Sequence, residues 1–89
     1  MYLLYFNLNY IIMDVENEIK KIFFEVFPAM QLQEFNWNKL QKEYENWDSF
    51  AHLHILTLTE EKFGISLSID ESTSIDSAKK LLDCVITHT

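Results

Sequence analysis

Glycine and proline each occur once in this chain of 89 residues, as Gly64 and Pro28. Because these two residue types supply most tight turns, the chain has few places at which a β-hairpin could reverse direction. Apolar residues make up 48% of the sequence and aromatic residues 15%, and a chain this hydrophobic does not stay disordered. The sequence therefore predicts one compact helical domain with a modest core.

The charge of the chain restricts its partners. The net charge is −7, with 14 acidic residues against 7 basic ones, and all of the basic residues are lysines. Binding of nucleic acid depends on neutralising phosphates, so we expect no nucleic-acid partner and favour partners with basic surfaces. The single cysteine, Cys84, cannot form an internal disulfide, which is typical of a reducing compartment and predicts a cytoplasmic protein.

Residues 1–13, MYLLYFNLNYIIM, form an apolar N-terminal extension. A helix that spans a bilayer needs about 20 residues, so no membrane span is expected. The extension also lacks the basic residues of a secretory signal or of an interfacial anchor. Two interpretations stay open: an extension outside the natural domain, as from a start codon assigned too far upstream, or a segment that packs onto the bundle.

Three segments show the apolar periodicity of amphipathic helices. The first is expected over residues 14–27, where acidic residues load the first turns and Pro28 follows the end. The second is expected over residues 49–63 and ends before Gly64. The third is expected to follow a cap at Asp76 or Ser77 and to end near Thr87.

Two shorter features are expected between these helices. Residues 28–48 form a long connection, which should be partly helical and covered by its aromatic side chains, with a short helix from Asn36 to about Glu45. A short helical turn is expected near residues 70–74.

The helix over residues 49–63 has two faces that could be buried. His52, Ile55, Leu56, Thr59 and Phe63 follow the spacing of one face, whereas Phe50, Leu53 and Thr57 lie on the opposite side. If the first set is buried, the second forms an exposed apolar strip, a feature that often marks a site for a partner.

Asp48, Ser49 and His52 are the residue types of a Ser-His-Asp triad, but their spacing does not suit one, and no G-x-S-x-G turn is present. Metal sites are not predicted either. His52 and His54 are two residues apart, so on a helix they point in different directions. The acidic stretch DESTSID lacks the glycine and the terminal glutamate of a calcium loop. We therefore expect neither catalytic residues nor metal ligands.

The segment ENWDSFAHLHILTLTEEKFGISL resembles the core motif of the acyl and peptidyl carrier proteins, in which an aspartate and a serine open the second helix. EIKKIFFEVFP before it and IDESTSIDSAKKLLDCV after it extend the resemblance from about Asp14 to Ile86. It implies an all-α, acyl-carrier-like bundle with three main helices, a short third helix and a long first loop, and it makes residues 14–89 the carrier domain. The WDS start is most similar to discrete, stand-alone carriers.

The resemblance also implies residue roles. Ser49 would carry a 4′-phosphopantetheine arm derived from coenzyme A, and Asp48 is its neighbour in the motif. The positions that match partner contacts of the family are Phe50, Leu53, Thr57, Glu60 and Glu61. Two residues depart from the family pattern: Lys62 interrupts the acidic run, and His54 stands where an acidic residue is common.

The implied function is to hold acyl or aminoacyl thioesters for fatty-acid, polyketide, nonribosomal-peptide or related specialised biosynthesis. The chain would then be a monomeric carrier and not an enzyme. A phosphopantetheinyl transferase would load the arm, and an acyl-activating ligase or a synthase with a basic docking surface would use it. The alternative is a carrier-fold interaction module that never receives an arm, since Asp48 or Ser49 suits a helix N-cap in any protein.

Overall fold

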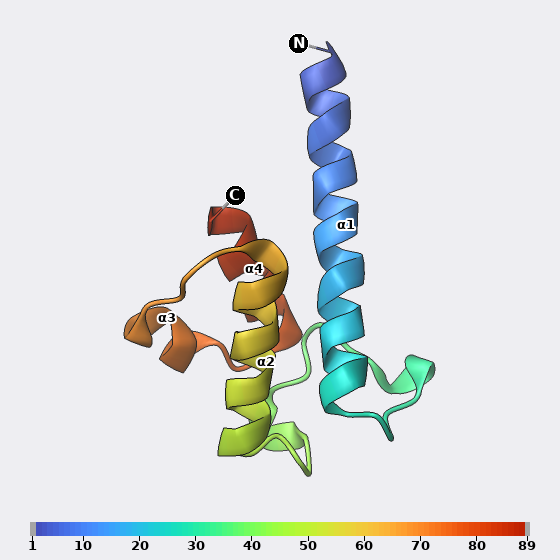
Figure 1. Ribbon diagram of the computed structural model, residues 1–89. Helices are drawn as coiled ribbons and strands as arrows, with labels where there is room; N and C mark the ends of the chain where they lie inside the picture. The colour runs from blue at the N-terminus through green and yellow to red at the C-terminus, as the bar shows by residue number, and fades with distance from the viewer. Residues whose placement is uncertain (1, 89) are drawn as a thin grey trace.

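The computed structural model describes residues 2–88 of the chain and the side chains of residues 10–88. Four α-helices follow one another: α1 (Tyr2–Val26), α2 (Ser49–Phe63), α3 (Ile69–Ser74) and α4 (Ala78–His88) (Figure 1). Two 3-10 turns, Leu32–Glu34 and Gln41–Glu43, lie in the connection between α1 and α2. The described residues contain no β-strand, only an isolated bridge between Leu40 and Ser77, so the prediction of a mostly helical fold is confirmed.

The start of the first helix was predicted wrongly. Helix α1 begins at Tyr2 and runs without interruption through Asp14, the expected first residue. The reason is that residues 2–13 contain neither glycine nor proline, so nothing in the backbone stops the helix there. Figure 1 shows this first part of α1 standing clear of the other helices, and the described side chains of Tyr10, Ile11 and Met13 are about half exposed.

The core lies where α1 packs against α2 and α4. The apolar faces predicted for the first and last helices are confirmed, whereas on α2 the sequence left two faces open. The buried residues of these helices are Val15, Ile19, Ile22 and Phe23 on α1, Ile55 and Thr59 on α2, and Ala78, Leu81, Leu82 and Val85 on α4. The inner face of α2 is thus the one that begins with His52, which is itself half-buried.

The connection between α1 and α2 is held down by aromatic rings, as expected. Phe23 is fully buried and makes ring contacts with four other aromatic residues, which are Phe27, Phe35, Tyr44 and Trp47. The expected helix from Asn36 to Glu45 is absent, and a single 3-10 turn replaces it. Backbone bonds to the start of α4 take the place of helical ones: Lys79 donates to the Trp37 carbonyl at 2.9 Å, and Gln41 to the Asp76 carbonyl at 2.7 Å.

The ends of the later helices follow their local signals. Gly64 ends α2 with a positive φ of 64°, a backbone conformation that glycine adopts without strain. The Ser77 hydroxyl accepts a hydrogen bond from the Lys80 amide at 3.1 Å, so Ser77 caps α4. Over the described part of the chain, no helix combines the length and hydrophobicity that crossing a membrane requires.

Candidate functional site

Ser49 is the first residue of α2 and is exposed. Asp48 caps the helix: its side-chain Oδ1 accepts a hydrogen bond from the Ala51 amide at 2.9 Å, and its carbonyl accepts one from the His52 amide at 2.9 Å. Trp47, only 5% exposed, anchors the chain in the aromatic cluster just before the cap. A buried anchor and a capped first turn therefore hold the serine at the surface.

The imidazole of His52 is bound at both of its nitrogens. The Trp47 indole N–H donates to Nδ1 at 3.0 Å, so Nδ1 is the acceptor and carries no proton. The other nitrogen, Nε2, lies 2.9 Å from the carbonyl of Ser72 and donates to it in this tautomer. No nitrogen is left to take a proton from Ser49 or to bind a metal. The contacts of His52 thus argue against the triad arrangement, as the spacing of the sequence does.

The outer face of α2 carries the predicted apolar strip. Phe50 is 84% exposed and Leu53 62%, and Thr57 is exposed beside them. Ile55 and Thr59 on the opposite face are fully buried. The strip, defined as Phe50, Leu53 and Thr57, therefore begins one residue after Ser49 and follows the helix axis.

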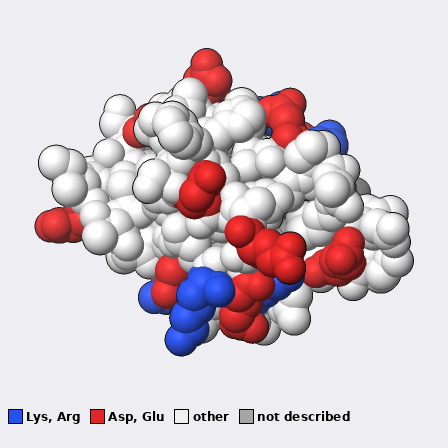
Figure 2. Space-filling model, turned by 90° about the horizontal axis from the view of Figure 1, so that it is seen from below, with Lys and Arg blue, Asp and Glu red and all other residues white. Residues whose placement is uncertain are grey.

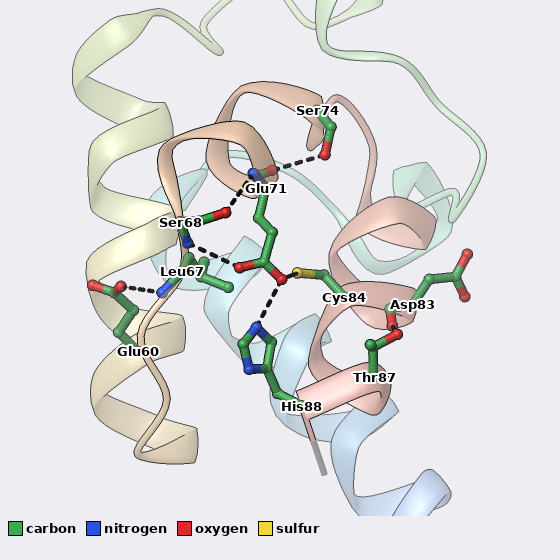
Figure 3. Close-up of polar contacts among 9 residues, drawn as sticks. All are labelled: Glu60, Leu67, Ser68, Glu71, Ser74, Asp83, Cys84, Thr87 and His88. Carbon is green, nitrogen blue, oxygen red and sulfur yellow. Dashed lines mark hydrogen bonds and ion pairs between the residues drawn. The ribbon is translucent and has the colours of Figure 1, made fainter.

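The acidic residues near the end of α2 differ in their surroundings. Glu61 is exposed, whereas the carboxylate of Glu60 accepts a hydrogen bond from the Leu67 amide at 2.8 Å and braces the link to α3 (Figure 3). Lys62 forms an ion pair with Glu18 of α1 at 3.1 Å, and this contact lowers the pKa of Glu18. Figure 2, the view toward the end where α2 begins, shows several acidic side chains gathered beside lysines near the lower edge and other acidic side chains scattered over the rest of the face.

Two surface hollows lie along the connection between α1 and α2. One, of about 420 Å³, is lined by residues that include Phe27, Met30 and Asn46. The other, of about 470 Å³, lies beside Leu40 and Trp47. Ser49 lines neither hollow, so neither would hold a small molecule against its hydroxyl.

Removal of the cap at Asp48 should destabilise the protein measurably. Asp48→Ala leaves the Ala51 amide without its acceptor, and we expect a loss of about 1 kcal/mol in the free energy of unfolding. Urea unfolding followed by circular dichroism measures this loss. Glu61→Ala removes an exposed carboxylate from the same helix, so it should change the free energy by less than about 0.5 kcal/mol. Equal losses in both variants would contradict the capping role.

A second polar cluster lies between α3 and the last turns of α4. Among the described residues, Glu71, Cys84 and His88 place one potential ligand atom each within 4.8 Å of one another (Figure 3). One carboxylate oxygen of Glu71, Oε1, accepts from the Ser68 amide at 2.9 Å. The other, Oε2, lies 3.4 Å from the Cys84 sulfur, which donates to it, and 2.8 Å from Nε2 of His88.

These contacts set the protonation of the cluster. The hydrogen bond from the Ser68 amide, and then the one from His88, lower the pKa of Glu71 to about 2. Burial first, and then the adjacent Glu71 carboxylate, raise the pKa of Cys84 to about 11. The thiol is therefore protonated at neutral pH, and Cys84 alone is a poor nucleophile.

None of these three residues is among the site residues predicted from the sequence. Cys84 and His88 are four residues apart on the predicted last helix, a spacing that places two side chains on one face and could have drawn attention to them. Glu71 comes from another helix, so its approach could not be inferred from spacing.

The Glu71 contacts predict a dependence of stability on pH. The folded-state pKa of about 2 lies below the ordinary value of 4.5, so the carboxylate stabilises the fold above pH 4.5, and this contribution is lost as the pH falls from 4.5 toward 2. The difference in melting temperature between wild type and Glu71→Gln should therefore shrink over that range. A constant difference for Glu71→Gln would contradict the assigned contacts.

Comparisons with known proteins add no family for this chain. No family model, no curated protein and no solved structure matches it. The proposed function therefore rests on the resemblance of the sequence to carrier proteins and on the contacts of the chain itself.

Proposed function

We propose that this chain is a carrier protein of the acyl and peptidyl carrier type, with a 4′-phosphopantetheine arm attached to Ser49. The observation that carries the proposal is an exposed serine hydroxyl at the first residue of α2, directly after the Asp48 cap and the buried Trp47 anchor. The order of three main helices, a short α3 and a long first connection is the one that the resemblance implies.

The start of α2 suits a phosphodiester. Backbone N–H groups and the positive end of the helix dipole favour an anion at this place. The Asp48 side chain accepts its hydrogen bond from the Ala51 amide. The backbone amides of Ser49 and Phe50 therefore remain available to the group attached to the serine. The arm supplies a thiol on which cargo is held as a thioester.

The site has the properties of an acceptor and lacks those of a self-sufficient catalyst. In the described part of the chain, no side chain hydrogen-bonds the Ser49 hydroxyl, and both nitrogens of His52 are bound elsewhere. Under this proposal, the base that removes the serine proton comes from another protein. This requirement fits a phosphopantetheinyl transferase, which transfers the phosphopantetheinyl group of coenzyme A to the serine oxygen and releases adenosine 3′,5′-bisphosphate.

The surface next to Ser49 suits transient docking. The strip of Phe50, Leu53 and Thr57 offers apolar contact, and the net charge of −7 attracts basic partner surfaces. Glu61 is exposed and can contact such a surface, whereas the Glu60 carboxylate already accepts a hydrogen bond from the Leu67 amide. We therefore assign the larger part of any acidic contact to Glu61. Weak, electrostatically steered binding lets a carrier visit a ligase and a synthase in turn.

Intact-mass measurement tests the proposal. The full chain is incubated with coenzyme A and a transferase of broad specificity, and we expect a gain of one phosphopantetheinyl group per chain. Incubation without coenzyme A gives the baseline. If several transferases produce no gain, the rival function is favoured, namely an interaction module with a carrier-like fold that never receives an arm.

A further inference from the structure

We propose that Glu71, Cys84 and His88 form a binding site for a divalent transition metal, with Zn²⁺ as the best match and water as the fourth ligand. The site joins α3 to the last turns of α4 (Figure 3). Its three residues come from α3 and α4, so the site shares no residue with Ser49 or with the strip on α2. The proposal does not depend on the proposed carrier function.

Helix geometry places two of the three ligands. Cys84 and His88 are four residues apart on α4, so their side chains project from the same face of the helix. Their ligand atoms, the cysteine sulfur and the histidine Nε2, both contact the same oxygen of Glu71. Two residues one turn apart are a compact chelating pair, and a third ligand from α3 closes the set.

The orientation of Glu71 is set by the start of α3. Glu71 and Ser68 form a reciprocal capping box: the Ser68 amide donates to Oε1 of Glu71 at 2.9 Å, and the Glu71 amide donates to the Ser68 hydroxyl at 3.1 Å. These two bonds direct the other oxygen, Oε2, at Cys84 and His88. A carboxylate ligand that is held by an outer hydrogen bond is a common feature of metal sites in proteins.

Two of the three separations between ligand atoms fit a tetrahedral site after a small adjustment, and the third, between the Cys84 sulfur and Nε2 of His88, is no more than 4.8 Å. Bonds to Zn²⁺ of about 2.0–2.3 Å in tetrahedral geometry place the ligand atoms about 3.4–3.6 Å apart. The distance from Oε2 of Glu71 to the Cys84 sulfur is 3.4 Å, which lies within this range. The distance from Oε2 to Nε2 of His88 is 2.8 Å, so the imidazole must move outward by roughly half an ångström to admit the metal. His88 is exposed near the end of α4, where such a movement has room.

The protons and charges of the binding step balance. The Cys84 thiol loses its proton to solvent as the sulfur–metal bond forms. His88 binds through Nε2 as a neutral imidazole, which requires that Nδ1 carry the remaining proton. One thiolate and one carboxylate then neutralise the two positive charges of the metal. A set of sulfur, nitrogen and oxygen ligands favours Zn²⁺ and its neighbours over Mg²⁺ or Ca²⁺, which prefer oxygen alone.

Titration with Co²⁺ tests the site, because cobalt replaces zinc in tetrahedral sites and is coloured. Reduced wild-type protein should bind one Co²⁺ per chain, with a thiolate-to-cobalt charge-transfer band in the near ultraviolet and intense bands in the visible. Addition of Zn²⁺ should displace the cobalt and remove both the charge-transfer band and the visible bands. Cys84→Ser should lose the charge-transfer band, and His88→Ala should weaken binding by at least about tenfold.

Matched variants distinguish the site from loose binding by surface groups. His54→Ala removes an exposed histidine from α2, and Asp70→Asn removes an exposed carboxylate next to Glu71, so both should bind Co²⁺ like wild type. The absence of a charge-transfer band in wild type would overturn the proposal. It would also be overturned if His88→Ala and Glu71→Gln both bound Co²⁺ as tightly as wild type.

Thermal unfolding gives a second readout that does not depend on the colour of cobalt. Zn²⁺ should raise the melting temperature of wild type, since the metal links α3 and α4 only in the folded chain. The increase should vanish in Cys84→Ser, a nearly isosteric change that we expect to fold. An equal increase in Cys84→Ser and wild type would contradict binding at this cluster.

Discussion

Replacing Ser49 by alanine should abolish the mass gain that coenzyme A and a phosphopantetheinyl transferase produce in the wild-type chain. Alanine lacks the oxygen that forms the phosphodiester, so the expected effect is complete loss of modification. The fold should not change, because Ser49 is exposed and the capping bond comes from Asp48. Alanine is also favourable within a helix. Intact-mass spectra over a time course, together with the urea midpoint of each variant, measure both expectations.

Ser66→Ala is the matched control for that experiment. Ser66 is an exposed serine in the loop after α2, so its removal should leave the mass gain at the wild-type level. A mass gain that persists in Ser49→Ala would place the modification at another residue and refute the assignment. Leu53→Glu gives a graded test of the strip: loading should slow while the urea midpoint stays near wild type, because the side chain is already 62% exposed.

Truncation of Phe23 should cause the largest loss of stability. Its ring is fully buried at the centre of the aromatic cluster, where it contacts four other rings, so Phe23→Ala removes apolar contacts and leaves a cavity. Such substitutions cost about 3–5 kcal/mol. A domain of this size has a total stability of only about 5–15 kcal/mol. A large fraction of the Phe23→Ala molecules should therefore be unfolded at moderate urea concentrations. Urea unfolding followed by tryptophan fluorescence measures the change.

The adjacent phenylalanine supplies the control for Phe23. Phe24 is half-buried on the same helix, and the centroid of its ring lies 6.0 Å from that of the Phe35 ring. Phe24→Ala should therefore cost clearly less than Phe23→Ala. Similar losses in the two variants would show that the cluster does not depend on the Phe23 ring.

The boundaries of α2 show what local chemistry can predict. Asp48 supplies the capping oxygen, and Gly64 accepts the left-handed backbone conformation. The apolar period between them left two faces open, and packing against α1 decided that Ile55 and Thr59 are buried. The start of α1 was missed for a related reason. A helix without a stopping residue has no local end. The acidic residues from Asp14 onward have the pattern of a first turn but lie within a longer helix.

The connection between α1 and α2 could not be predicted in detail from its own residues. Its aromatic side chains correctly indicated that it packs on the core. Its backbone, however, bonds to residues at the start of α4, as in the bond from Lys79 to the Trp37 carbonyl. Partners about forty positions away in the chain decide such bonds, so the local propensity for a helix from Asn36 to Glu45 was overridden.

The sequence by itself determined that the chain is helical, where α2 begins and ends, and that Ser49 is the first residue of that helix. Those features follow from contacts between residues that are close together in the sequence. Such contacts form whatever the segment packs against in the folded protein. Only the tertiary structure decided that Trp47 and Ser72 occupy both nitrogens of His52, and that Glu71 meets Cys84 and His88. These contacts join different elements, and packing of the helices brings their atoms within bonding distance.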